Sequence, residues 1–434
     1  MNRIFKLDRM VWAVAMLLGV SAAQGAAGIQ LEVESRHAAG GRAVIRHELA
    51  RELADRLGGA PVTLLEAREA GASAEAAAWP AELLFPEERT DGRATLLLAW
   101  PGAQAAGAIR RLTLSAAPDA VRAPTDLRFE QADGLLRVGN GHFEVTHDLQ
   151  KGGAIVAVTY PDGTRVDVKQ RDGVRGYSLA QDKAPTVTVL GRPGGLGASV
   201  EIEARFLDRG AQHEALTVRY RYLYTADSPW IRLEAELPEQ TPGQVHTQVR
   251  LLDLEFATKE TLPESVPLIT ASSGPAYGGL IPQREKLGGD HRPRAGTLWY
   301  GPAWALAWAQ PVLNEDFVHE WSGERQILSA SLYLGPAETA ADNLLRAEGP
   351  LVRVMLPALA ERLAAGQAAA AELTGAPGAL AQALLAAARQ RMEDSYDLVG
   401  LRELLVAGEA VLAAPPAADG VAQYETDRFL ALAN

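Results

Sequence analysis

Apolar and polar residues alternate with a period of two along many short stretches of the chain, which is typical of half-buried β-strands. The alternation begins at Ile29–Glu34 and recurs in runs such as Val62–Glu66 and Ala94–Trp100, with Asp91-Gly92 marking a turn between them. Arg111–Ser115 completes this group. The pattern predicts a small N-terminal β barrel or sandwich domain over residues 27–118.

One segment of this first domain is ambiguous. Ile45, Leu49, Leu53 and Leu57 stand four residues apart, which favours a helix ended by Gly58-Gly59. The first half of the segment fits a strand equally well, so both interpretations stay open.

From Phe129 onward the pattern is strand after strand, to a last strand at Leu351–Leu356. Leu135–Asp148 and Lys151–Val158 are predicted as two strands that meet through Gly152-Gly153. In 199–206 the residues Glu201, Glu203 and Arg205 alternate with apolar neighbours, which predicts a sheet with one solvated face. We expect a large antiparallel β-sandwich over 125–357.

The last part of the chain has the residue pattern of helices instead of strands. Ala379–Ser395 and Leu398–Leu412 are rich in alanine, leucine and arginine at helical spacing, with a break at Tyr396-Asp397. They predict a C-terminal α-helical hairpin within 370–434, with a short further helix at Tyr424–Leu432. The expected fold class is therefore mainly β with a short helical end.

The first 26 residues contain, in order, the basic, apolar and cleavage-site regions of a secretory signal peptide. Basic Arg3, Lys6 and Arg9 precede an apolar stretch at Met10–Val20, and Ser21-Ala22-Ala23 fits a cleavage site. A short membrane anchor is the alternative. With no cysteine and a net charge of −12, the composition predicts a periplasmic or secreted protein without disulfides, without a nucleic-acid partner and without membrane attachment after cleavage.

Two blocks of the sequence resemble a known family. Asn140–Val145 with Lys151–Ile155 is similar to the entry strands of galactose-mutarotase-like β-sandwiches, and Trp100-Pro101-Gly102 with Ile109–Arg111 looks like the small barrel that precedes such a sandwich in exo-rhamnogalacturonan lyase-like proteins. That resemblance implies a small β barrel, a sandwich and a large α/α toroid. Only a short helical segment follows the sandwich here, so the toroid is largely missing, and no catalytic residue is carried over.

Residues 277–321 are the part of the predicted sandwich richest in groups that hold sugars. Aromatic rings stack on the C–H faces of sugars, while charged groups bind hydroxyls or a carboxylate. For β-elimination, Arg292 or Arg294 would neutralise a uronate carboxylate, His291 would abstract the α proton and Tyr277 would protonate the leaving oxygen. The expected substrate-binding residues are Arg294, Asp290, Trp299, Tyr300, His319 and Trp321.

Structural explanations compete with each of these roles. Trp304 and Trp308 stand at even spacing in an apolar strand, which favours the core. Asp290–Arg294 also fits a solvated loop. Glu315 and Asp316 could ligate Ca²⁺, but acidic runs in β loops are mostly solvated, and no cofactor is expected.

These patterns favour an exported carbohydrate-active protein that binds a polysaccharide or oligosaccharide. If it is an enzyme, we expect a polysaccharide lyase acting by β-elimination on an acidic glycan. The alternative is a non-catalytic glycan-binding or scaffold protein on the same sandwich. A hydrolase or epimerase is a third possibility, with no assignable acid and base. The oligomeric state is not indicated.

Overall fold

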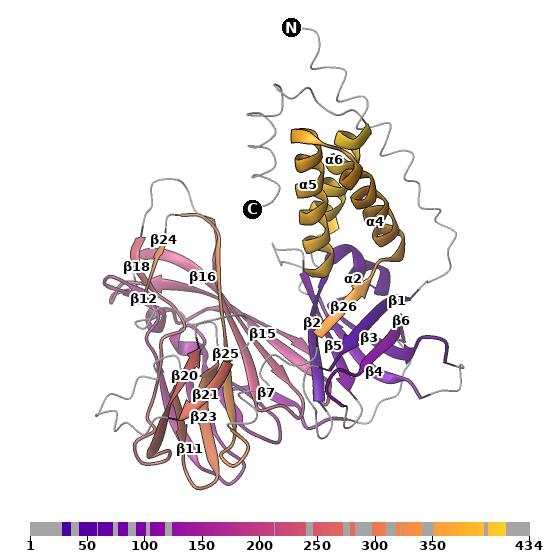
Figure 1. Ribbon diagram of the computed structural model, residues 1–434. Coiled ribbons are helices and arrows are strands. Elements are labelled where there is room, and N and C mark those ends of the chain that lie inside the picture. Colours follow the sequence, from indigo (N-terminus) through magenta and orange to yellow (C-terminus); the bar gives the residue numbers. More distant parts are fainter. Residues whose placement is uncertain are drawn as a thin grey trace.

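The computed structural model describes residues 28–35, 43–58, 60–72, 77–85, 93–100, 105–117, 124–211, 213–239, 246–271, 278–282, 297–309, 318–321, 323–340, 351–394 and 398–413. The protein is mainly β, as predicted, with large antiparallel sheets and C-terminal helices. Two lobes stand side by side in Figure 1. Residues 28–117 and 351–413 form the first lobe, and residues 124–340 form the sandwich lobe.

A single antiparallel sheet is the centre of the first lobe. Within the described residues its order is β2-β5-β4-β3-β6-β1-β26. Leu31, Val33, Leu96 and Leu98 point to one side of this sheet and are buried there. The strands are β1 (Ile29–Glu34), β2 (Ala43–Ala50), β3 (Val62–Glu69), β4 (Trp79–Leu84), β5 (Arg93–Trp100), β6 (Ile109–Ala116) and β26 (Leu351–Met355).

The position of β26 corrects a prediction. Its sequence was expected to end the sandwich, but β26 pairs along β1 in the first lobe, with Gln30 opposite Met355 and Glu34 opposite Leu351. Val352 and Val354 are buried in the core of that lobe. The alternation of β26 predicted a strand correctly, but alternation does not say which sheet a strand joins.

The ambiguous segment at 42–57 contains both predicted elements in succession. Strand β2 ends at Ala50, and helix α2 (Arg51–Leu57) follows at once. Gly58 ends the helix with φ of 137°, a backbone conformation that favours glycine. Leu53 and Leu57 are buried against the sheet.

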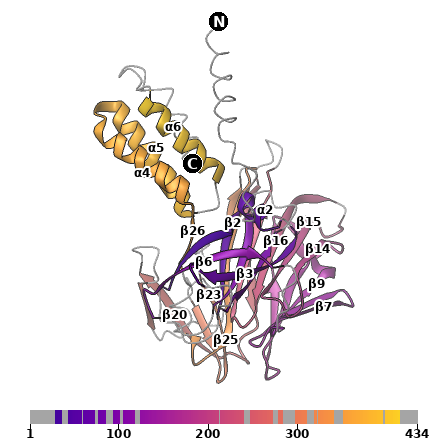
Figure 2. The same cartoon turned by 90° about the vertical axis from the view of Figure 1, so that its right-hand side faces the viewer.

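Three C-terminal helices extend the core of the first lobe. They are α4 (Pro357–Glu372), α5 (Gly375–Asp394) and α6 (Leu398–Ala413). Leu363, Leu385 and Leu404 belong to the same apolar cluster as the strands, and Figure 2 shows the bundle at the β26 end of the lobe. The predicted hairpin is α5 and α6, α4 is an addition, and Tyr424–Leu432 lies outside the described residues. None of the described helices is both long and apolar enough to cross a membrane.

Two antiparallel sheets pack face to face in the sandwich lobe. In the described part of the chain the smaller sheet has the order β19-β11-β10-β9-β8-β7. Its strands are β7 (Arg128–Ala132), β8 (Leu135–Gly139), β9 (Glu144–Asp148), β10 (Ala154–Thr159), β11 (Arg165–Gln170) and β19 (Leu254–Phe256).

The larger sheet has the order β21-β20-β22-β23-β25-β17-β16-β15-β13-β12-β18-β24 among the described residues, with β14 also paired to β15. Val138 and Ile155 of the smaller sheet share one core with Val200 and Ile231 of the larger one. Its strands are β12 (Gly173–Val174), β13 (Tyr177–Ser178), β14 (Thr186–Gly191), β15 (Gly197–Leu207), β16 (Glu214–Thr225), β17 (Trp230–Leu237), β18 (His246–Arg250), β20 (Glu264–Ala271), β21 (Gly278–Pro282), β22 (Thr297–Tyr300), β23 (Trp304–Ala309), β24 (Val318–Trp321) and β25 (Gln326–Pro336).

The predicted two-strand hairpin at 135–158 is in fact three strands. The first predicted strand turns back at Asn140, whose N–H donates to the carbonyl oxygen of Phe143 at 2.9 Å. Strand β9 then leads through a short 3₁₀ turn (Leu149–Lys151) and Gly152-Gly153 into β10. Both glycines have positive φ, so the predicted turn at this point is present.

The two lobes meet through a small apolar cluster and an ion pair whose carboxylate is buried. Leu84 and Leu97 of the first lobe pack with Leu196 and Leu223 of the sandwich lobe. Beside them the Glu82 carboxylate, with no exposed surface, accepts hydrogen bonds from Arg192 at 2.9 and 3.1 Å and from the Leu196 N–H at 2.7 Å.

Candidate functional site

The larger sheet presents one polar face, and strand register decides which residues stand on it. Ile231 and Leu233 of β17 point into the core, so their neighbours Arg232, Glu234 and Glu236 point outward. Cross-strand pairing places Glu234 beside Arg221 of β16, and Arg221 beside Glu201 of β15. The solvated face predicted from 199–206 therefore continues across neighbouring strands.

Acidic and basic residues alternate from strand to strand on this face. Arg221 donates from Nε to Glu201 Oε1 at 3.0 Å, and its Nη1 lies 3.3 Å from Glu234 Oε2. In the next row the Arg219 Nε lies 2.8 Å from Glu203 Oε2. Each arginine is therefore held in place by a carboxylate on an adjacent strand.

The face is hollowed where these rows meet. A depression of about 110 Å³, here called the charged groove, is lined by residues of β14 to β17 and β25. The side chains of Arg221 and Glu234 are only 16% and 17% exposed although they lie on the outer face. The lining residues are Thr186, Thr188, Glu201, Ile202, Glu203, Arg219, Tyr220, Arg221, Glu234, Glu236 and Ile327.

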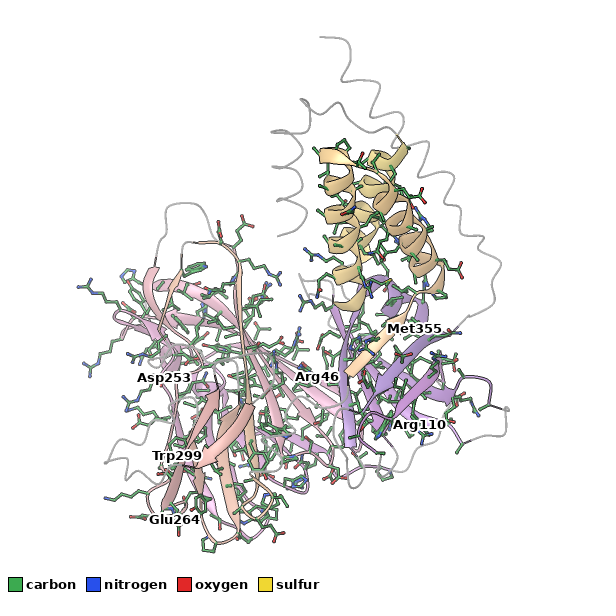
Figure 3. All side chains as sticks on the ribbon, viewed as in Figure 1. Arg46, Arg110, Asp253, Glu264, Trp299 and Met355 are labelled. Atoms are coloured by element: carbon green, nitrogen blue, oxygen red, sulfur yellow. The ribbon has the colours of Figure 1, made fainter. Side chains whose placement is uncertain are left out.

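The first lobe lies beside one end of the groove. Arg46 of β2 is on the side of the first lobe that faces the sandwich (Figure 3). Burial, together with the nearby positive charge of Arg46, lowers the pKa of Arg232 below its ordinary value. Arg232 donates to Ser329 Oγ at 2.5 Å. Arg232 is therefore oriented by Ser329 of the adjacent strand β25 and lies near Arg46 of the first lobe.

A second polar cluster lies beneath the groove, inside the sandwich. The Asp172 carboxylate accepts hydrogen bonds from Tyr220 Oη at 2.7 Å and from the Leu252 and Asp253 N–H groups at 3.0 and 2.8 Å. Burial raises the pKa of Asp172 to about 6. Because this cluster is fully enclosed, we assign it a structural role.

Histidine 147 is enclosed in the same core. Its Nε2 lies 2.6 Å from Tyr224 Oη and its Nδ1 lies 3.0 Å from the carbonyl oxygen of Gly153. The carbonyl can only accept, so Nδ1 carries the proton and Nε2 accepts from the tyrosine. Burial lowers the pKa of His147 to about 4, so the ring is neutral at pH 7.

Most of the site residues predicted from the sequence lie outside the described residues. These are the three candidate catalytic residues and two of the binding residues: Tyr277, His291, Arg292, Asp290 and Arg294. The candidate Ca²⁺ ligands Glu315 and Asp316 lie outside them as well. In the part of the chain that the structure describes, no group of three or more histidine, aspartate or glutamate residues is placed to hold a metal ion.

The predicted aromatic platform is not assembled by the described residues. Trp299 is half-buried and packs against the sandwich core, whereas its neighbour Tyr300 packs on the opposite face of β22. Strand β23 separates β22 from β25, the nearest strand that lines the charged groove, and Trp299 lies at the Glu264 end of the lobe (Figure 3). Neither ring lines the groove.

The burial of Trp321 contradicts its predicted role as a substrate-binding residue. It is 2% exposed, belongs to the sandwich core and donates from its indole nitrogen to the carbonyl oxygen of Glu324. A ring without an exposed face cannot stack on a sugar, so Trp321 is a core residue. His319 lies opposite Val249 in β24, and the structure describes only its backbone.

Of the two tryptophans predicted to be core residues, the structure describes the side chain of Trp304 but not that of Trp308. Trp304 packs against the sandwich core and stacks on Tyr160 with ring centroids 5.0 Å apart. For Trp308 the structure describes the backbone but not the side chain.

The charged groove is indicated in the sequence by pairs of like charges, of which the prediction used only the pair in 199–206. Glu201 and Glu203, Arg219 and Arg221, and Glu234 and Glu236 are like-charged pairs at a spacing of two in three successive strands. Opposite charges on adjacent antiparallel strands stabilise one another. The sign alternation acid, base, acid therefore indicates three neighbouring strands with a shared outer face.

Comparisons with known proteins give distant likenesses. An α-mannosidase from Enterococcus faecalis V583 covers 81% of this chain at 8% identity and a TM-score of 0.39, and a glycosyl hydrolase family 38 protein from Enterococcus faecalis covers 80% at 9% identity and 0.41. A YidC insertase covers 52% at 12% identity and 0.29. This chain covers 48%, 50% and 44% of those chains, so it spans about half of their length. No protein-family model and no curated protein matches the sequence.

Proposed function

We propose that this protein binds a saccharide in the charged groove. The observation that carries the proposal is the row formed by Glu201, Arg221 and Glu234, in which two carboxylates flank one guanidinium in a depression on a rigid sheet. Carboxylates accept hydrogen bonds from hydroxyl groups and guanidinium groups donate to them, so such a row fits adjacent hydroxyls of a sugar ring.

The groove also offers an apolar contact. Ile327 of β25 lines it and is 39% exposed, so its aliphatic side chain is accessible to a ligand in the groove. A sugar presents C–H groups on one face and hydroxyls at its rim, so it can contact Ile327 while its hydroxyls reach the charged rows. A binding site built on strands is held more rigidly than one built on loops.

The test is a binding titration with a panel of oligosaccharides. The double variant Glu203→Ala/Arg219→Ala removes both members of one ion pair that lines the groove. We expect at least a tenfold loss of affinity, about 1.4 kcal/mol, from the loss of one or two hydrogen bonds. Its matched control is Arg165→Ala/Asp167→Ala, which removes an exposed pair at 2.9 Å in the smaller sheet and should leave the affinity unchanged. If no oligosaccharide binds, or if the groove variant binds like the wild type, the proposal is wrong.

Catalysis and export stay predictions of the sequence. β-Elimination at Tyr277, His291 and Arg292 is checked by incubating the protein with uronate-containing polysaccharides and following the absorbance of the unsaturated product. Export is checked by N-terminal sequencing of the protein from a periplasmic or culture fraction, where the mature chain should begin near residue 27. A non-catalytic glycan-binding protein satisfies the binding test and gives no elimination product.

A further inference from the structure

The charges that line the groove restrict which saccharides it accepts. The lining includes four glutamates (Glu201, Glu203, Glu234 and Glu236) and two arginines (Arg219 and Arg221), which gives a net charge of 2 − 4 = −2. We infer that the ligand is a saccharide without carboxylate groups, whose hydroxyl or amino groups donate hydrogen bonds to these glutamates. This inference rests on the proposed function and restricts its ligand from any saccharide to one without carboxylate groups.

The arginines of the groove do not offer a site for a uronate. Arg221 lies between Glu201 and Glu234, at 3.0 and 3.3 Å, and Arg219 lies 2.8 Å from Glu203. An incoming carboxylate would have to displace a glutamate from its guanidinium and would stay close to the displaced charge. Like charges in a partly enclosed site repel more strongly than in bulk water, because fewer water molecules screen them.

Two further arginines adjoin the lining without changing this conclusion. Arg325 Nε lies 2.7 Å from Glu236 Oε1, and Arg232 Nε lies 3.7 Å from Glu234 Oε1. Both neutralise a glutamate from outside the groove. With them the groove and its surroundings hold four arginines and four glutamates, so the charges balance, and each of these arginines is already paired with a glutamate.

Donor groups on a sugar match the lining much better. Hydroxyl groups donate to a carboxylate without bringing a charge, and a protonated amine adds an electrostatic attraction to the carboxylate that it approaches. The net charge of the whole chain, −12, has the same sign as that of the groove. At low salt it therefore disfavours the approach of polyuronates and favours that of amino-sugar polymers.

The experiment compares tetrasaccharides that differ in one substituent. Titrations with tetramers of galactose, galactosamine and galacturonic acid, and with the matching glucose series, are carried out at 0.05 M and 0.5 M salt. We expect the neutral or amino form to bind at least tenfold more tightly than the uronate. We also expect Glu203→Gln to reduce this preference, and higher salt to weaken uronate exclusion because it screens the repulsion.

The outcomes separate the two proposals. Uronate binding at least as tight as neutral binding, and lost in Glu203→Ala/Arg219→Ala, would overturn the inference and leave the proposed function standing. A preference against uronates that neither salt nor Glu203→Gln changes would assign the discrimination to shape and also overturn it. Absence of binding by all the tetramers would overturn the proposed function and the inference together.

Discussion

At the scale of single residues, the buried polar groups of the two lobes are of two kinds. In the sandwich, Asp172 and His147 are enclosed, and several neighbours hydrogen-bond to them. In the first lobe, the Nε2 atom of His47 is buried and has no hydrogen-bond partner in the described part of the chain. A buried polar atom without a partner destabilises the fold, whereas a satisfied one does not.

Replacing His47 by leucine should therefore stabilise the protein by about 1–3 kcal/mol at pH 7. Burial lowers the pKa of His47 from 6.5 to about 4, so the unfolded chain binds more protons than the folded chain between these values. Wild-type stability falls as the pH drops through this range, by about 3 kcal/mol from this group. The variant lacks that loss, so its advantage should grow toward pH 4. Urea unfolding at pH 7 and pH 4.5 measures both effects, and a variant less stable at both pH values would contradict the expectation.

Asp172 should have the opposite dependence on pH. Its pKa is raised from 3.8 to about 6, so the folded chain binds the extra proton between these values, and stability falls as the pH rises through them. The contribution is about 3 kcal/mol. In Asp172→Asn the free energy of unfolding, taken relative to the wild type, should rise by about this amount from pH 4 to pH 6. A flat difference between the two pH profiles would show that Asp172 does not titrate in this range.

At the scale of elements, turns determine where one strand ends and the next one begins. Asn140 is 1% exposed and ends β8. Its side-chain nitrogen donates to the carbonyl oxygens of Thr225 and Ser228 at 2.9 and 2.7 Å, and its oxygen accepts from the His142 N–H at 2.8 Å. The side chain therefore fixes the turn and also joins the smaller sheet to the end of β16.

Asn140→Ala should cost about 2–4 kcal/mol of stability, because it leaves several buried backbone groups without a partner. The matched control is Asp162→Ala in the exposed turn between β10 and β11, where Asp162 accepts one hydrogen bond from the Thr164 N–H at 2.9 Å. That change should cost less than about 1 kcal/mol. Chemical denaturation of both variants decides the matter, and equal costs would mean that the buried contacts of Asn140 contribute little.

For some elements the sequence contains a signal for the start or end of the element that the prediction did not use. Asn140-Gly141 is a strong hairpin signal, and it lies inside the stretch predicted as one strand. Pro357 at the start of an alanine-rich run is typical of a helix N-terminus, and α4 begins there. The boundary between β2 and α2 has no comparable signal, because Ala50 makes no side-chain capping hydrogen bond.

At the scale of the whole molecule, the two lobes are joined where β4 meets the loop before β15. Glu82 is buried there and holds Arg192 and the Leu196 N–H. A side chain at Gly197 would come within 2.3 Å of the Leu97 side chain, so Leu97 of the first lobe packs directly against the backbone of the sandwich lobe at this point.

Glu82→Gln should destabilise the protein by about 1–3 kcal/mol, because it removes the buried carboxylate that accepts hydrogen bonds from the Leu196 N–H and from Arg192. The control is Glu409→Gln, which removes the carboxylate that Arg362 binds at 2.8 and 3.2 Å between α4 and α6. That pair is 37–38% exposed, so its loss should cost less than about 1 kcal/mol. Urea unfolding of both variants is the measurement, and a smaller effect for Glu82→Gln than for Glu409→Gln would contradict a stabilising role of the junction.

Hydrophobic periodicity is a local property of consecutive residues, and it was sufficient to predict the β-rich class, the two long C-terminal helices and the polar face of β15. The pairing of β26 with β1, the packing of the helices in the first lobe and the burial of Trp321 became visible in the folded chain. The fold also assembled the groove from Glu201, Arg221 and Glu234. These depend on which distant segments pair, and pairing is fixed by long-range packing that no short stretch of sequence encodes.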